Sequence, residues 1–166
     1  MRFLAVAAIA LATLGFAGGA QAQQTRLFFE ADVVRGNQDG APGPFCVLNS
    51  QFKRLEKLVW RIRVLDQTGA ALDDKTLKTL VVEIPDGQKF PARFGPHPAP
   101  RLGPTVDHFW SARWIIPADY PTGSFSYKVT ATTQNGYSQT WEPFKVAFAH
   151  LTIANAAIEL KPQPKK

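Results

Sequence analysis

One alternating segment, residues 124–131, constrains what this chain can fold into more than any other feature. Its apolar side chains occupy every second position, as Phe125, Tyr127, Val129 and Ala131, and the residues between them are polar. A period of two places the apolar side chains on one face of a strand and leaves the other face to solvent. A turn rich in Pro and Gly precedes the segment, and Asn135-Gly136, a strong hairpin signal, follows it. The segment therefore predicts a half-buried antiparallel strand.

Similar short segments recur along the chain, and turn signals separate them every ~8–12 residues. Strands are predicted over residues 27–35, 58–65, 77–84, 89–94, 108–116, 124–134 and 137–147. Residues 45–48 fit either a strand or a buried loop, and residues 151–160 fit either a strand or a short helix. Many short strands with almost no helix predict an all-β fold, a single antiparallel β-sandwich of about seven to eight strands. Eight side chains are expected inside it: Trp60, Ile62, Val82, Trp110, Trp114, Phe125, Tyr127 and Val129.

The first 22 residues have the pattern of a cleaved signal peptide. A short basic start is followed by an apolar run, and Ala20-Gln21-Ala22 provides a small-x-small cleavage site. The apolar run is shorter than the ~20 residues that a membrane span needs. The sequence thus predicts a signal peptide over residues 1–22, a sandwich domain over 23–153 and a basic, Pro-containing tail over 154–166. It also predicts an exported, periplasmic protein with no membrane span in the mature chain.

Charge and cysteine content narrow the classes of partner. The formal net charge is +6, yet the charges are spread out, and the one dense basic cluster is residues 161–166. Because the protein is expected to be periplasmic, no nucleic-acid partner is predicted. An anionic lipid, an acidic protein surface or a role in solubility alone stay open. The single cysteine, Cys46, cannot form a disulfide within the chain, so packing must hold the domain together.

The segment around the Asn-Gly turn resembles the last hairpin of bacterial immunoglobulin-like and macroglobulin-type domains. The residues that carry this resemblance are Pro117, Asp119, Pro121, Gly123, Phe125, Tyr127, Val129, Ala131 and Gly136. It covers about a third of the mature chain, and Tyr127 stands where the second cysteine of an antibody-type domain is expected. The resemblance implies an immunoglobulin-like sandwich that serves as a binding or spacing module. It implies no catalytic residue.

A Pro-rich segment is the predicted binding site. Residues 95–104 hold four Pro and two Gly, which predicts an extended, structureless loop. Such a loop is already extended and loses little entropy on binding. We expect binding by His97, Arg101, His108 and Phe109, which lie in this loop or beside it. A passive crossover between the sheets is the alternative.

A metal site is the second functional hypothesis. Thiolate and imidazole groups suit copper, zinc or haem iron, and the chain's only Cys and His residues are Cys46, His97, His108 and His150. Their spacing matches no compact metal motif. An ordinary buried cysteine and three unrelated histidines explain the same residues, and in that interpretation there is no cofactor.

No arrangement in the sequence indicates catalysis. The neighbours of Cys46 are apolar, whereas a reactive thiol needs a positive and partly exposed setting. Asp73 and Asp74 are adjacent and would diverge, and no nucleophile elbow or phosphate-binding glycine loop is found. We therefore expect a non-catalytic periplasmic binding or accessory module, not an enzyme. Its expected partner is another periplasmic or membrane-associated protein, with redox and transport components as examples.

Overall fold

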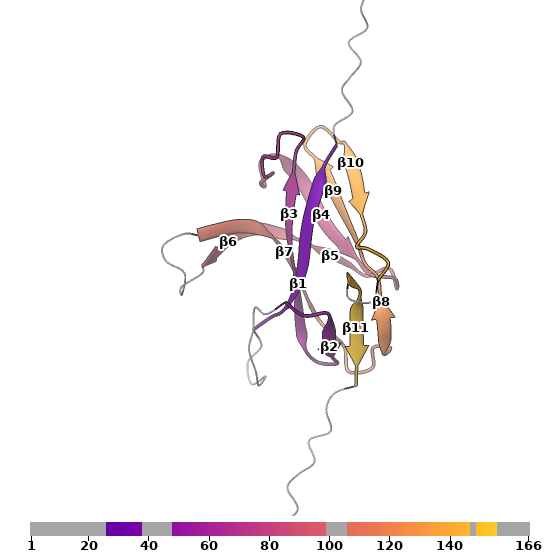
Figure 1. The fold of residues 1–166 in the computed structure, drawn as a ribbon. Coiled ribbons are helices and arrows are strands. Elements are labelled where there is room, and N and C mark those ends of the chain that lie inside the picture. Colours follow the sequence, from indigo (N-terminus) through magenta and orange to yellow (C-terminus); the bar gives the residue numbers. More distant parts are fainter. Residues whose placement is uncertain (1–25, 38–47, 99–105, 147–148, 156–166) are drawn as a thin grey trace, which may run out of the picture.

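The structure is a computed structural model that describes residues 26–37, 48–98, 106–146 and 149–155 (Figure 1). The predicted signal peptide, Cys46, Arg101 and residues 156–166 of the predicted tail lie outside these ranges. The described residues form eleven strands and no α-helix, which confirms the all-β prediction. Among them, no helix is long and apolar enough to cross a membrane.

The first sheet has four antiparallel strands. They are β1 (Phe28–Arg35), β3 (Lys57–Leu65), β7 (Val106–Ile115) and β6 (Arg93–Pro98), in that spatial order. Strand β1 pairs with β3 along its whole length without a register shift. Strands β1 and β6 are therefore the two edges of this sheet.

The remaining strands form a second four-stranded sheet and a small three-stranded one. The second sheet has the order β10 (Ser138–Trp141), β9 (Lys128–Thr133), β4 (Leu77–Glu83) and β5 (Lys89–Pro91). The small sheet has the order β2 (Gln51–Lys53), β11 (Leu151–Ala154) and β8 (Gly123–Phe125). The pairing of β2 with β11 is parallel, the single exception to the predicted antiparallel arrangement among the described strands.

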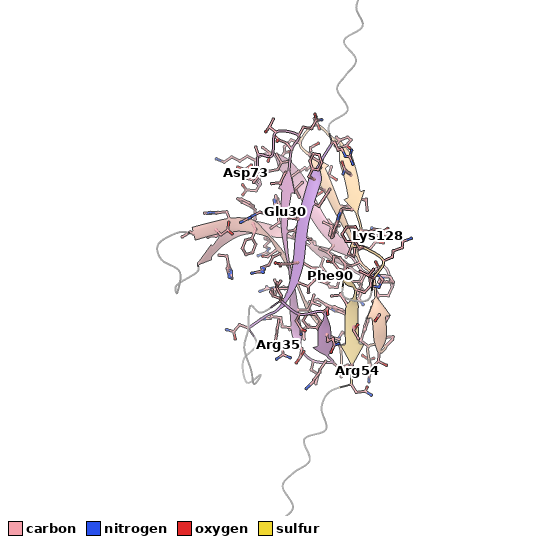
Figure 2. All side chains as sticks on the ribbon, viewed as in Figure 1. Glu30, Arg35, Arg54, Asp73, Phe90 and Lys128 are labelled. Carbon is pink, nitrogen blue, oxygen red and sulfur yellow. The ribbon has the colours of Figure 1, made fainter. Side chains whose placement is uncertain are left out.

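An apolar and aromatic core fills the space between the sheets. Seven of the eight side chains predicted to be inside are buried: Trp60, Ile62, Val82, Trp110, Trp114, Tyr127 and Val129. Phe125 is half-buried and packs against the edge of this core. No polar or charged residue in the described part of the chain is fully buried, and charged side chains such as Arg54 and Lys128 point outward (Figure 2).

The strand count exceeds the prediction because two predicted strands each divide between sheets and because β2 was not predicted. Residues 89–94 divide at Ala92, whose N–H donates to Leu80 O at 2.8 Å, with β5 in the second sheet and β6 in the first. The predicted strand over 124–134 divides at Ser126 and Tyr127, with β8 in the small sheet and β9 in the second. This division explains why Phe125 does not share the buried face of Tyr127.

The Pro-rich segment differs from its prediction as a loop. Gly95, Pro96, His97 and Pro98 belong to β6 and pair with β7 residues from Phe109 back to Val106. An edge strand tolerates proline because its outer N–H groups need no partner. The outer ends of β6 and β7 project from the sandwich as a hairpin, which we call the arm (Figure 1). The structure does not describe residues 99–105.

Candidate functional site

The arm carries three of the predicted binding residues but brings only two of them together. His97 lies opposite Asp107, and His108 lies opposite Pro96, so the two histidines occupy opposite faces of the hairpin. The His97 ring is 5.2 Å from the Phe109 ring between centroids. His108 instead lies 5.9 Å from the Phe94 ring. The arm thus presents His97 with Phe109 on one face and His108 on the other.

The proposed metal ligands are dispersed among the described residues. His150 directly precedes β11, in a different sheet from the arm. Within the described ranges, no group of three or more His, Cys, Asp or Glu residues is placed to hold a metal ion. Cys46 lies outside these ranges. The metal hypothesis therefore stays a prediction, and the described histidines do not form one site.

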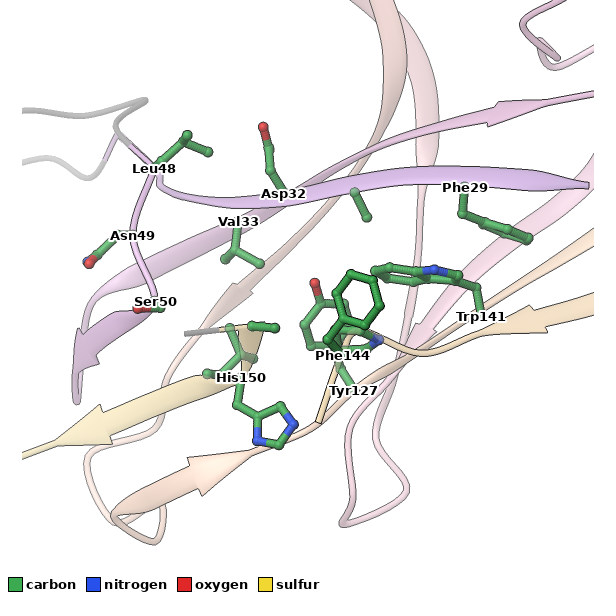
Figure 3. A pocket seen from close by; sticks show the side chains of 14 residues that line it. Phe29, Asp32, Val33, Leu48, Asn49, Ser50, Tyr127, Trp141, Phe144 and His150 are labelled. Carbon is green, nitrogen blue, oxygen red and sulfur yellow. The ribbon is translucent and has the colours of Figure 1, made fainter. Parts of the chain in front are cut away.

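A groove opens between β1 and β10, the edges of the two large sheets, and we call it the aromatic groove (Figure 3). Its volume is about 510 Å³. Trp141 is its centre: the ring stacks almost parallel to Phe29, with centroids 6.3 Å apart, and meets Tyr127 at 6.2 Å. Other lining residues are Val33, Phe144 and His150. The groove is thus a mainly apolar slot with aromatic walls.

Local sequence explains how this groove stays open. The alternation of β1 turns Phe29, Ala31 and Val33 toward the groove. On the other side β10 ends at Trp141, and the buried Pro143 follows, which cannot continue the ladder. Phe144 then stands at the mouth with 83% of its surface exposed. The two sheet edges therefore diverge beyond Trp141 instead of closing over the core.

The backbone of β1 is open along the groove. At one end Gln139 acts as a substitute for a paired strand, since its side-chain amide donates to Leu27 O at 2.7 Å and accepts from Leu27 N at 2.8 Å. At the other end Val33 O accepts from Asn49 N at 3.0 Å. On an antiparallel edge strand, the backbone N–H and C=O groups of every second residue point away from the neighbouring strand. Those of Leu27 and Val33 point away from β3, so those of Phe29 and Ala31, which lie between them at every second position, do so too. These groups have no partner among the described residues.

Polar residues also line the groove, namely Asp32, Asn49, Ser50, Tyr127 and His150, and two of them can serve a ligand from inside it. The buried Nε2 atom of His150 has no hydrogen-bond partner within the described part of the chain. Burial, with a smaller contribution from the nearby Asp32 charge, raises the pKa of Tyr127 to about 12. Tyr127 is therefore neutral at ordinary pH. Both groups can form hydrogen bonds with a ligand that enters the groove.

Sequence reasoning did not find the aromatic groove. The alternating pattern predicts Tyr127 inside the core, and it is buried, whereas Trp141 is half-buried at the end of β10. The one local signal was Pro143 followed by Phe144, a strand end with an aromatic residue directly after it. Comparisons of the chain with protein-family models, characterised proteins and solved structures find no match, so the site is interpreted from its own geometry.

Proposed function

We propose that this protein is a non-catalytic, exported accessory module that binds another periplasmic protein by accepting an extended segment of that partner along β1. The observation that carries this proposal is the open backbone at Phe29 and Ala31, directly beside the aromatic groove. Addition of a strand to an exposed sheet edge obtains affinity from main-chain hydrogen bonds and specificity from pockets for alternate side chains. The groove is such a pocket.

The aromatic groove favours a large apolar side chain from the partner. Phe29 and Trp141 form its walls, and Leu48 and Phe144 expose 65% and 83% of their surface at its rim. Burial of one such side chain contributes about 1.5–3 kcal/mol, and each main-chain hydrogen bond adds about 0.5–1.5 kcal/mol. Because the open stretch of β1 is short, these terms predict a weak and reversible complex.

The arm is proposed as a second contact with a partner. The arm projects from the sandwich (Figure 1), and His97 and Phe109 lie together on one of its faces, half-buried, where a second surface can reach them. Together with Arg101 and His108 these are the residues expected from the sequence to bind. A redox or transport component with an extended apolar segment is the kind of partner proposed.

Replacement of Ala31 with proline tests whether the partner pairs with the backbone of β1. The N–H of Ala31 faces outward, so proline removes a donor that the partner needs and leaves the pairing of β1 with β3 without a lost hydrogen bond. Capture from a periplasmic extract identifies the partner, and titration calorimetry measures its affinity. We expect Ala31→Pro to weaken binding about 2- to 13-fold, because one main-chain hydrogen bond contributes about 0.5–1.5 kcal/mol.

Ile115→Ser is the control for non-specific apolar binding. Ile115 is a large apolar residue that is exposed, at 55%, like the rim residues of the groove, but it lies at the end of β7 and does not line the groove. This variant is expected to bind as the unmodified protein does. Unchanged affinity of a folded Ala31→Pro variant, or an equal loss in both variants, contradicts the proposal.

A further inference from the structure

A second groove lies where β5, β6 and β7 meet, and we call it the basic groove. Its volume is about 540 Å³. Four of its lining residues are cationic: Lys57, Lys89, Arg93 and Arg113. No aspartate or glutamate is present among the described residues that line it. Ser111 lies between the two arginines, and Phe90 and Val59 contribute an apolar surface.

The carboxylates on this face of the first sheet are already paired with other residues. Arg61 donates two hydrogen bonds to Asp32, at 2.7 and 2.6 Å. Arg63 pairs with Asp107 and lies 3.8 Å from Glu30. Arg93 and Arg113, by contrast, make no ion pair within the described part of the chain. Lys89 lies 3.4 Å from Glu83, so among the described residues the uncompensated positive charge of the basic groove belongs to Lys57, Arg93 and Arg113.

Strand register arranges three of these cations, Lys57, Arg113 and Arg93, along a diagonal across β3, β7 and β6. Arg93 pairs with Ser111, and Arg113 is two residues further along β7 on the same face, so the two arginines are diagonal neighbours. The stem of Lys57 lies over the buried Gly36, where an added Cβ would approach Lys57 Cδ to 2.7 Å. Lys57 Nζ donates to Asn37 O at 2.7 Å, which leaves two of its three donors for a ligand.

We propose that the basic groove binds an acidic polypeptide segment. Arginine guanidinium groups form paired hydrogen bonds with carboxylates, and a line of separate cations fits successive carboxylates of an extended chain. The apolar residues Phe90 and Val59 allow side-chain stems to pack between the charges. A membrane surface is flat, whereas this site is a groove beside β6, so the shape favours a peptide. The proposal depends on different residues from the aromatic groove and is tested separately.

The experiment measures binding of a fluorescent oligoglutamate peptide to the mature chain by anisotropy. We expect saturable binding that weakens with added salt, because exposed charge pairs are screened. The double variant Arg93→Gln/Arg113→Gln is expected to bind about tenfold more weakly, since two exposed charge contacts are lost. Arg93→Lys/Arg113→Lys keeps the charge and should show a smaller loss. Circular dichroism verifies the fold of each variant.

Lys75→Gln/Lys78→Gln removes the same number of charges at exposed positions outside the basic groove. This control should retain the affinity of the unmodified protein. An equal loss in the control means that net charge alone attracts the peptide, and this overturns the proposal. Unchanged binding by the folded arginine-to-glutamine variant also overturns it. So does binding through Arg93 and Arg113 to phosphatidylglycerol vesicles but not to the peptide, which assigns the surface to a membrane.

Discussion

Replacement of Trp60 with alanine is expected to lower the free energy of unfolding by about 3–5 kcal/mol. Trp60 is fully buried at the centre of β3. Its ring lies 5.4 Å from Phe90, 6.4 Å from Trp114 and 5.9 Å from Tyr127, measured between centroids. Alanine removes all of these contacts and leaves a cavity that strands of two sheets cannot close. Urea denaturation monitored by far-ultraviolet circular dichroism measures the loss.

Trp60→Phe separates the packing of this ring from its polar atom. The indole Nε1 of Trp60 is buried without a hydrogen-bond partner among the described residues. A buried unpaired donor is unfavourable, so its removal offsets part of the cost of the smaller ring. We expect a clearly smaller loss for phenylalanine than for alanine. Equal losses in the two variants, or a loss below about 1 kcal/mol for alanine, would place the ring outside the stabilising core.

The sequence predicts the interior of the sandwich well for a simple physical reason. In a strand, a shift of one residue moves every side chain to the other face, so an alternating pattern specifies which side is buried. Trp60, Ile62 and Val64 alternate with arginines along β3, and all three are buried. Trp110 and Trp114 follow the same rule in β7.

The pattern does not specify which sheet a strand joins. An alternating segment appears the same whether it stays in one sheet or divides between two. Pro91 indicates an edge strand or a broken one over 89–94, but no signal indicates the change of sheet there or at Ser126. The pairing of β2 with β11 joins segments about a hundred residues apart, and no local signal marks it. The prediction of a loop at the start of the Pro-rich segment was wrong, because residues 95–98 belong to β6. Prolines are frequent in loops, but an edge strand tolerates them equally well.

The candidate sites illustrate the same limit. Phe29 and Trp141 are stacked, yet each is recognisable from the sequence only as one apolar residue of a separate strand. The groove between them depends on how two sheet edges diverge, which is a tertiary property. Residues close in sequence were easier, since His97 and Phe109 lie on one hairpin and do meet. Arg101 and Cys46 lie outside the described residues, so their predicted roles stay predictions.

The aromatic groove also predicts a loss of stability at alkaline pH. The pKa of Tyr127 is raised to about 12 from its ordinary value of 10.0, first by burial and then by the Asp32 charge. Above pH 10 the unfolded chain gives up this proton while the folded chain keeps it, so the free energy of unfolding falls as pH rises from 10 to 12. A pKa difference of two units between the folded and unfolded chain corresponds to a loss of about 2–3 kcal/mol in the free energy of unfolding. Urea denaturation at a series of pH values measures the decrease.

Tyr127→Phe should remove this part of the pH dependence. The other tyrosines contribute equally to both proteins, so the difference between the two stability curves isolates Tyr127. Asp32→Asn removes the smaller of the two causes and keeps the shape of the groove. Its alkaline loss should therefore be smaller than that of the unmodified protein but not absent, because burial is the larger cause. If Tyr127→Phe loses as much stability as the unmodified protein between pH 10 and 12, the hydroxyl is hydrated and the groove is not the apolar slot described above.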